Sequence, residues 1–471
     1  MRDIVIVVGL LALIPLIFKR PYIGALVWTW IAILNPHREA FGFSSAIRPN
    51  LLIVGVTLLA LVLHSEKKRW PGGALSLTFV AFMAWTTLTT ALAPDFETSF
   101  EFYNDFVVKM ALHMVVLLIV INSRHRLTSL VWCFALSLGY HAVKIALVTV
   151  KSGFIIGRYR GFGPLDTMID DRNHFAVAML MLAPILFFLF RHASSRLMKN
   201  AALVGMICCF LSVVGSFSRG GLVTMAAMIG VLWLKTRKKW LSGSILALVA
   251  VVGASAVPEE YRERIGSAIE QFQTPETRYE DQAELDESFC LRLAAWGVGW
   301  RMTLDSPIVG NGLRSIQNPE VADPYLAESA CNESEDYEAR AAHNIYVEVL
   351  SDSGFPGLVL FVMILLGSIY QCWRITRRTR NDPAMAWAHD LASMIQVSII
   401  GYCIGGMLLS FAYYDGFYVL VVMVAVLWRL VLEHEGKRVP RHEANRAPQR
   451  RKRVRKPRSE PIRGRPRPVR A

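Results

Sequence analysis

The chain has 471 residues, of which 54% are hydrophobic and only 19% are charged. This composition is too apolar for an ordinary soluble protein, and many apolar runs approach the roughly 20 residues that an α-helix needs to cross a bilayer. The runs are continuous, whereas the strands of a membrane β-barrel alternate between polar and apolar residues. The sequence therefore predicts an all-α polytopic membrane protein.

Two short apolar segments, residues 4–18 and 22–34, open the chain. The first has no small-residue cleavage site and more apolar runs follow it, so we expect it to be retained rather than removed as a signal peptide. Both segments are short for a full crossing, so about 12 or 13 spans are compatible with the sequence and the side of the N-terminus stays open. The later spans are expected at residues 51–63, 73–92, 106–121, 127–150, 175–190, 201–215, 221–234, 241–257, 356–373, 392–411 and 417–432.

Charge is distributed unevenly along the chain, whose formal net charge is +14. Residues 433–471 hold 15 Lys and Arg against 4 Asp and Glu, whereas residues 258–342 hold 7 Arg, no Lys and 18 Asp and Glu. Positive residues stay on the cytoplasmic side, so we expect the C-terminus inside and the acidic loop outside. Counting spans backward then places every basic loop inside: 67–69, 124–126, 191–199, 235–239 and 374–380.

These patterns predict four parts, which are an N-terminal transmembrane bundle at 1–257, an outer loop domain at 258–355, C-terminal transmembrane helices at 356–432 and a basic tail at 433–471. The tail is rich in Arg and Pro, so we expect it to be disordered and to anchor the topology at anionic lipid headgroups. It lacks interleaved aromatic residues, which disfavours nucleic acid as a partner. The regular positive-inside pattern is typical of a bacterial inner membrane, whose outer side is the periplasm.

Three segments are expected to bring arginine to the outer face. They hold Arg158, Arg160 and Arg172, then Arg219 in a Ser-Arg-Gly-Gly run, then Arg292. Guanidinium forks match phosphate oxygens and stay charged, so these residues are candidate clamps for a pyrophosphate. The alternatives are a snorkelling or capping role for Arg219 and ordinary pairing of Arg292 with neighbouring carboxylates.

One histidine, His343, closes the acidic loop just before an apolar span. An imidazole accepts a proton near neutral pH, so His343 is the candidate catalytic base, with a structural hydrogen-bonding role as the alternative. Glu348, Asp352 and Gly354 mark the end of a short helical stretch ahead of that span.

Arg292 also recurs with two indoles, Trp296 and Trp300, at the i, i+4, i+8 spacing of one helix face. Such a face is typical of a helix that lies in the membrane interface. The outer loop further holds Cys290 and Cys331, which an oxidising compartment would allow to pair as a disulfide; free thiols are the alternative.

Several motifs are missing from the sequence, namely H-E-x-x-H, D-x-D, Walker A and G-x-S-x-G. A zinc protease, a D-x-D sugar-nucleotide enzyme, an ATPase and an α/β-hydrolase therefore lose support. We expect a site without metal or cofactor in which arginine is the cation.

The run from Ser218 to Gly220, Arg292 with Trp296, the Pro-Ile-Val-Gly-Asn-Gly run at 307–312 and the stretch from His343 to Gly354 together resemble the O-antigen ligase superfamily. This superfamily includes WaaL-type ligases, Wzy-type polymerases and protein O-oligosaccharyltransferases. The Ile-Leu-Asn-Pro-His-Arg run at 33–38 is similar to the O-glycosylation ligases associated with exosortase systems.

The resemblance implies a GT-C-like helical bundle with a periplasmic site that takes a glycan from undecaprenyl pyrophosphate and transfers it to a hydroxyl. By motif, Arg219 and Arg292 would hold the pyrophosphate and His343 would activate the acceptor, while Arg158, Arg160 and Arg172 match a looser pattern. Lipid A core and protein hydroxyls are both expected acceptors. A Wzy-type polymerase stays open as an alternative, as does a transporter of lipid-linked glycan, which would need charged residues deep within several spans.

Overall fold

The computed structural model describes residues 2–40, 49–65, 68–153, 162–236, 239, 280–326 and 339–444. The chain forms two units, residues 1–431 and residues 432–471. Regular structure in the described part is helical, without a strand, which confirms the predicted all-α class. The α-helices are α1 Arg2–Lys19, α2 Pro21–Leu34, α3 Pro49–Leu63, α4 Ala74–Ala91, α5 Phe96–Phe102, α6 Val108–Val120, α7 Arg124–Lys151, α8 Arg172–His192, α9 Arg196–Gly215, α10 Arg219–Lys235, α13 Glu280–Asp305, α14 Pro319–Ala322, α15 Ile345–Thr379, α16 Ala386–Gly405 and α17 Asp415–Ala444.

Eight helical segments among the described residues are long and apolar enough to cross a membrane, which agrees with a polytopic protein. They are Ala74–Ala91, Phe96–Val120, Arg124–Lys151, Arg172–His192, Arg196–Gly215, Ile345–Thr379, Pro383–Leu408 and Asp415–Gly436. The helices α2 and α3 are apolar but shorter. The expected span at 241–257 lies outside the described residues.

Two boundaries differ from the sequence-based expectations. The span expected at 392–411 ends earlier, because α16 stops at Gly405 and a single 3-10 turn, Gly406–Leu408, follows it. The second difference is in the next helix, α17, which runs to Ala444. Residues 433–444 therefore continue this helix, although they were expected to belong to the disordered tail. Helix propagation costs little once a helix has formed, and the first residues after 432 include Glu and Lys, which favour helices. Residues 445–471 lie outside the described part.

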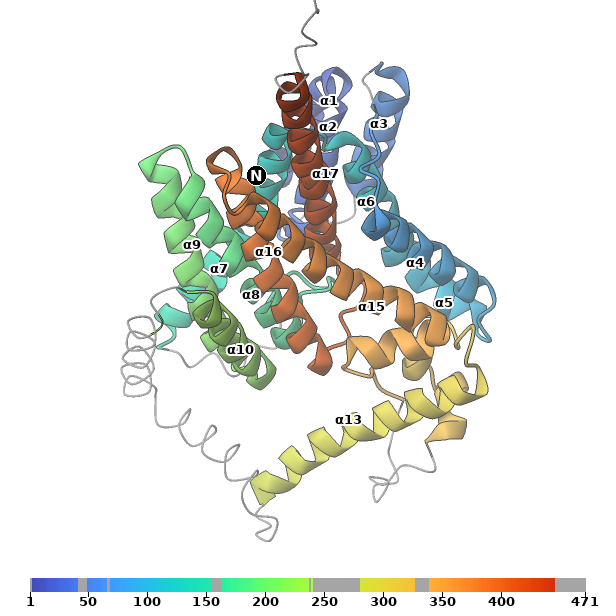
Figure 1. The fold of residues 1–471 in the computed structure, drawn as a ribbon. Coiled ribbons are helices and arrows are strands. Elements are labelled where there is room, and N and C mark those ends of the chain that lie inside the picture. Colours follow the sequence, from blue (N-terminus) through green and yellow to red (C-terminus); the bar gives the residue numbers. More distant parts are fainter. Residues whose placement is uncertain are drawn as a thin grey trace, which may run out of the picture. The chain divides into compact units, whose positions relative to one another are not determined.

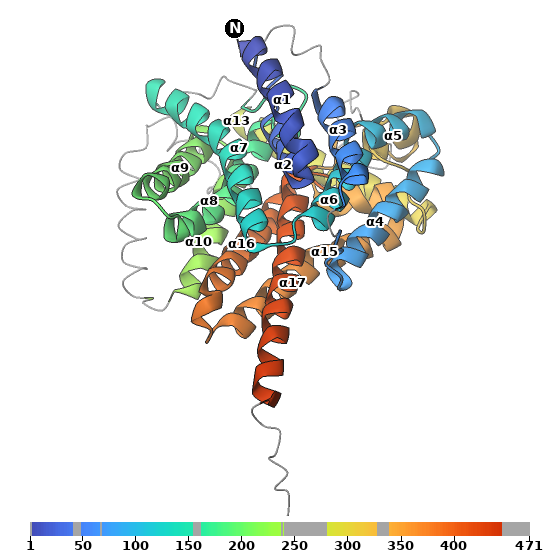
Figure 2. The same cartoon turned by 90° about the horizontal axis from the view of Figure 1, so that it is seen from above.

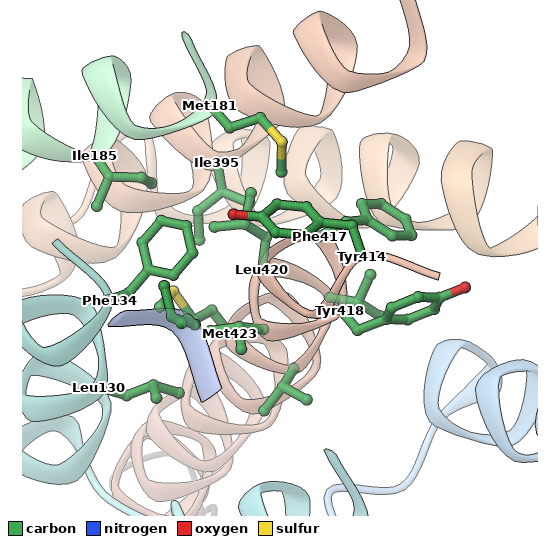
Figure 3. Packing of buried hydrophobic residues seen from close by; sticks show 14 of the residues in the cluster. Leu130, Phe134, Met181, Ile185, Ile395, Tyr414, Phe417, Tyr418, Leu420 and Met423 are labelled. Atoms are coloured by element: carbon green, nitrogen blue, oxygen red, sulfur yellow. The ribbon is translucent and has the colours of Figure 1, made fainter. Parts of the chain in front are cut away.

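Of the candidate membrane spans, the one in α17 has the largest share of buried residues. Figures 1 and 2 show its position beside the other helices. Figure 3 shows Leu420 and Met423 of α17 among Phe134 of α7, Ile185 of α8 and Ile395 of α16, all fully buried. In lipid there is little hydrophobic drive between helices, so such close van der Waals packing is what holds the spans together. The first unit is thus assembled around α17.

Basic residues tie together the helix ends that lie away from the site described below. The guanidinium of Arg429 donates to the carbonyls of Arg69 and Ile121, which joins α17 to the end of α6 and the segment before α4. The ring of His192 at the end of α8 lies 2.8 Å from the carboxylate of Asp390 at the start of α16. These contacts join the ends of some helices to the starts of others, as expected for helices that run in opposite directions.

A break divides α15 at Gly354, whose φ of 66° and ψ of −173° are not helical. Pro356 has no N–H to offer the carbonyl of Asp352, and its ring disfavours a continuous helix there. The freed carbonyls of Ser351 and Asp352 instead accept hydrogen bonds from the backbone N–H groups of Asn311 and Gly312, at 2.8 and 3.0 Å. The short helical stretch expected before the span is confirmed, and residues 307–312 are seen to pair with its end.

Replacing Gly354 with alanine should destabilise the fold by on the order of 1–3 kcal/mol, because its backbone region is essentially restricted to glycine. A Cβ there would also meet the backbone carbonyl of Ile308. The measurement is the apparent melting temperature of the purified protein in detergent. Gly139→Ala is the matched control, because Gly139 lies within α7 and a Cβ added there meets nothing within 4 Å. Equal melting temperatures for the two variants would contradict the role given to Gly354.

Candidate functional site

Three helices begin beside one another and are joined by side-chain hydrogen bonds. Each has a polar N-cap residue, Asp171 for α8, Ser218 for α10 and Asn344 for α15. The hydroxyl of Ser218 donates to the side-chain oxygen of Asn173 over 2.7 Å, which ties the start of α10 to the start of α8. The cap side chains satisfy several of the first N–H groups, and the positive ends of the three helix dipoles, which favour anions, remain close together.

The loop between α16 and α17 joins the third helix to this group. Ser410 in that loop accepts two hydrogen bonds, one at its hydroxyl from the backbone N–H of His343 and one at its carbonyl from the ring of His174, both 2.9 Å long. The starts of α8 and α15 are therefore held on either side of one residue. We call residues 171–174, 218–221, 343–344 and 410 the helix-start cluster.

His343 lies immediately before α15 in a left-handed backbone conformation, with φ of 46°. This conformation is uncommon for a residue other than glycine and marks a position that the surroundings hold in place. The preceding residue, Ala342, accepts a 2.7 Å hydrogen bond from the indole of Trp296, so α13 fixes this segment from its other side. Figure 1 shows α13 lying along one end of the bundle, across the direction of α17.

The imidazole of His343 is mostly buried, and its proton affinity reflects that position. Burial first, and then the charges of Arg292 and His174, lower the pKa of His343 to about 4, while Asp171 opposes the shift. A neutral ring has a free lone pair and can accept a proton. Near neutral pH, His343 is therefore in the form that a general base requires.

Arg292 lies one helical turn before Trp296 on α13 and is half-buried. Burial lowers the pKa of its guanidinium, and the charge of Asp171 partly opposes this, so Arg292 and Asp171 influence each other. Arg292 also acts electrostatically on His343. The acidic side chains at 280–287 lie outside the described ones, so ordinary pairing of Arg292 with a neighbouring carboxylate stays an alternative.

The other expected arginines fall at different places. Arg219 is the first residue of α10 and is exposed, next to the Ser218 that bonds to α8. Arg172 is the first residue of α8 and is also exposed. Arg158 and Arg160 lie outside the described residues. Two of these four arginines thus stand at helix starts of the cluster.

Three residues of the cluster were not singled out from the sequence: Asp171, His174 and Ser410. The carboxylate of Asp171 caps α8 by accepting from the backbone N–H groups of Asn173 and His174, at 2.7 and 3.3 Å. Its Oδ1 also lies 3.2 Å from Nδ1 of the His174 ring. The available signal was local and concerned Asp171 alone, because an aspartate just before an apolar run is typical of a helix N-cap.

Two carboxylates of α15, Glu348 and Asp352, are buried below the cluster. The backbone N–H of Ala412 donates to Oε2 of Glu348 over 3.0 Å, and the hydroxyl of Tyr413 lies 3.4 Å from Oδ2 of Asp352. Both contacts hold the loop that contains Ser410. These carboxylates therefore help to place the loop against α15.

The expected disulfide between Cys290 and Cys331 concerns side chains outside the described residues. The cysteines that are described, Cys133, Cys208, Cys209, Cys372 and Cys403, are free thiols in or beside helices. Small apolar side chains of this kind are typical of packing positions.

Comparison with known families gives two matches that together cover most of the chain. Residues 204–362 match a family model described as O-antigen ligase, and this range contains Arg219, Arg292 and His343. Residues 1–194 match a family of unknown function, DUF5935, and this range contains Asp171 and His174. A search of the curated proteins finds no match.

The depressed proton affinity of His343 predicts a pH-dependent stability. The unfolded chain binds this proton near pH 6.5 and the folded chain only near pH 4, so the contribution of His343 is complete above about pH 6.5 and declines as the pH falls toward about 4. The wild type should therefore lose more thermal stability over this window than His343→Gln does. Parallel stability curves for the two proteins would show that His343 titrates normally.

Proposed function

We propose that this chain, whose residues 204–362 match the O-antigen ligase model, is a glycan ligase that works at the outer face of a bacterial inner membrane. Its donor is a glycan on undecaprenyl pyrophosphate and its acceptor is a hydroxyl. The observation that carries this proposal is the gathering of His343 and Arg292 at the helix-start cluster, since the first can accept a proton and the second can bind phosphate.

The orientation of the site rests on charge. The opposite helix ends, which Arg429 of α17 and His192 of α8 join to neighbouring segments, adjoin basic loops that the positive-inside rule assigns to the cytoplasm. The helix-start cluster lies at the other ends of the same helices, which corresponds to the periplasm. A lipid-linked donor reaches such a site from the membrane, and an acceptor reaches it from the water.

Donor binding uses two kinds of positive group. The starts of α8, α10 and α15 are linked to one another through Asn173 and Ser410, and the positive ends of their dipoles suit a phosphate. Arg292 and Arg219 add guanidiniums, which can bind a pyrophosphate through two hydrogen bonds each. Exposed Arg172 at the start of α8 is a third candidate, and Arg158 and Arg160 are further ones by motif alone.

Transfer follows from the two groups together. The acceptor oxygen attacks the anomeric carbon of the donor, its proton passes to the imidazole of His343, and the bond to undecaprenyl pyrophosphate breaks with both electrons leaving on the pyrophosphate. Direct displacement inverts the anomeric configuration. The guanidiniums offset the charge that develops on the leaving group, which is the role a divalent cation has in other pyrophosphate chemistry.

Donor binding also adjusts the base. The positive charge of Arg292 contributes to the low pKa of His343, so a bound pyrophosphate, by neutralising that charge, raises the pKa toward the range in which a base is effective near pH 7. The site then accepts a proton best when a donor is present.

The acceptor class is less constrained than the donor. Lipid A core and protein serine or threonine hydroxyls both suit one base and a positive cluster, and a second lipid-linked glycan would make the same chemistry a polymerase. A transporter would need charged or titratable residues within its spans that are available to a substrate. Two such residues in the spans already have partners: Lys144 forms a 2.7 Å ion pair with Glu39, and His113 is hydrogen-bonded to Thr29 at 2.9 Å, so this alternative gains no support from them. The narrower likeness to exosortase-associated ligases stays a prediction.

The test is transfer in vitro from an undecaprenyl-pyrophosphate glycan to lipid A core, to a protein or to a second donor, in the presence of EDTA. We expect the wild type to be active and His343→Ala to bind donor normally but transfer about 10²–10⁴-fold more slowly, as is typical when a general base is removed. Arg292→Ala and Arg219→Ala should weaken donor binding roughly 10- to 100-fold, the worth of a charged hydrogen bond.

Arg377→Ala is the matched arginine control, because Arg377 stacks on Trp373 near the far end of α15. It should leave donor binding and transfer unchanged. Normal transfer by His343→Ala would refute the catalytic assignment, and loss of wild-type activity in EDTA would refute the metal-independent mechanism.

A further inference from the structure

The hydrogen bonds of His174 define the protonation state of its ring. Nε2 lies 2.9 Å from the carbonyl oxygen of Ser410, which can only accept, so Nε2 carries a proton. Nδ1 lies 3.2 Å from Oδ1 of Asp171. An ionised carboxylate also only accepts, so both ring nitrogens are satisfied together only in the doubly protonated ring.

Asp171 is kept in its ionised form. Burial by itself raises the pKa of Asp171, but the hydrogen bond and charge of His174, with two backbone N–H donors, together hold it below the ordinary value. Asp171 and His174 lie 3.2 Å apart at the first turn of α8, and they form an ion pair when the ring of His174 is protonated. The side chain of His174 is 15% exposed, so water screens the pair only in part.

The position of His174 connects this pair to His343. The ring of His174 packs edge-on against Phe411, with ring centroids 4.8 Å apart. It is also hydrogen-bonded to the carbonyl of Ser410, whose hydroxyl accepts a hydrogen bond from the backbone N–H of His343. The ring of His174 therefore lies on one side of Ser410 and the candidate base on the other.

We propose that His174, paired with Asp171, is a positioning residue for His343: its doubly protonated ring fixes Ser410, which places the backbone of His343, and its charge keeps the His343 ring neutral. The inference rests on the proposed function only in taking His343 as the base. The hydrogen bonds of His174 stand independently of any reaction.

The groups around His174 come from every neighbouring element. Its own helix start carries Asp171 and Arg172, α10 begins with Arg219, α13 carries Arg292, α15 carries His343 and Glu348, and the loop before α17 carries the phenols of Tyr413 and Tyr414. The groups that act on His343 by their charge are Arg292 and His174, which lower its pKa, and the single carboxylate of Asp171, which raises it. Removing one positive charge from this group should therefore make protonation of His343 easier.

The test measures the titration of His343 directly, by NMR of the full-length protein with ¹⁵N-labelled histidine, with His343→Gln used to assign the signal. In His174→Gln, whose amide can still donate to Ser410, the pKa of His343 should rise by on the order of 1 unit. The acid limb of the kcat/KM profile should move to higher pH in the same direction, because protonated His343 cannot act as a base.

His192→Gln is the matched control. His192 lies on the same helix, also contacts an aspartate, Asp390 at 2.8 Å, and is separated from the site by the length of α8. It should leave the titration of His343 unchanged. An unchanged His343 pKa in His174→Gln would overturn the proposal.

A second measurement does not depend on folding of a variant. In the wild type near neutral pH, both ring nitrogens of His174 should give the ¹⁵N shifts of an imidazolium, and a neutral ring would overturn the proposal. If both NMR results hold but His343→Ala transfers glycan normally, the proposed function fails while the coupling between the two histidines stands.

Discussion

The arrangement of the site depends on Ser410 more than on any other residue. Its carbonyl is held by the ring of His174 and its hydroxyl receives the backbone N–H of His343, so one short loop joins the starts of α8 and α15. The left-handed backbone at His343 is a strained conformation that survives only where neighbours over-determine it. The bond from its own N–H to Ser410, and the indole of Trp296 on the carbonyl just before it, are the contacts that do so.

The loop with Ser410 is in turn secured from below. Glu348 accepts from the backbone of Ala412, and the hydroxyls of Tyr402 and Tyr418 donate to the carbonyls of Phe411 and Ala412 at 2.7 and 3.0 Å. A stretch of irregular backbone between two apolar helices has polar groups that lipid cannot satisfy. These side chains satisfy them within the protein, which explains why carboxyl and phenol groups are buried at this depth.

Much of the fold could be predicted from the sequence, because membrane spans are set by apolar length and loop charge. The break at Gly354 and the helix with Arg292 and Trp296 could be predicted as well, since glycine, proline and a four-residue spacing have local meanings. His174 and Ser410 could not. Each fell at the margin of an expected span, at 175–190 and 392–411, and looked like an ordinary polar end. Their importance comes from a contact between positions 236 residues apart, which no local pattern encodes.

The same contact determines which parts of the chain the site requires. Arg219, Arg292 and His343 lie in the segment that matches the O-antigen ligase model, at 204–362, whereas Asp171 and His174 lie in the segment at 1–194. Ser410 lies in neither. The matched segment thus contains Arg219, Arg292, Trp296 and the proposed base His343, whereas Ser410, which accepts from the backbone N–H of His343, and His174, which bonds to Ser410, lie outside it. Because a base is effective only when its position and proton affinity are both fixed, the proposed mechanism requires the helices from α8 to α17 in addition to the matched segment.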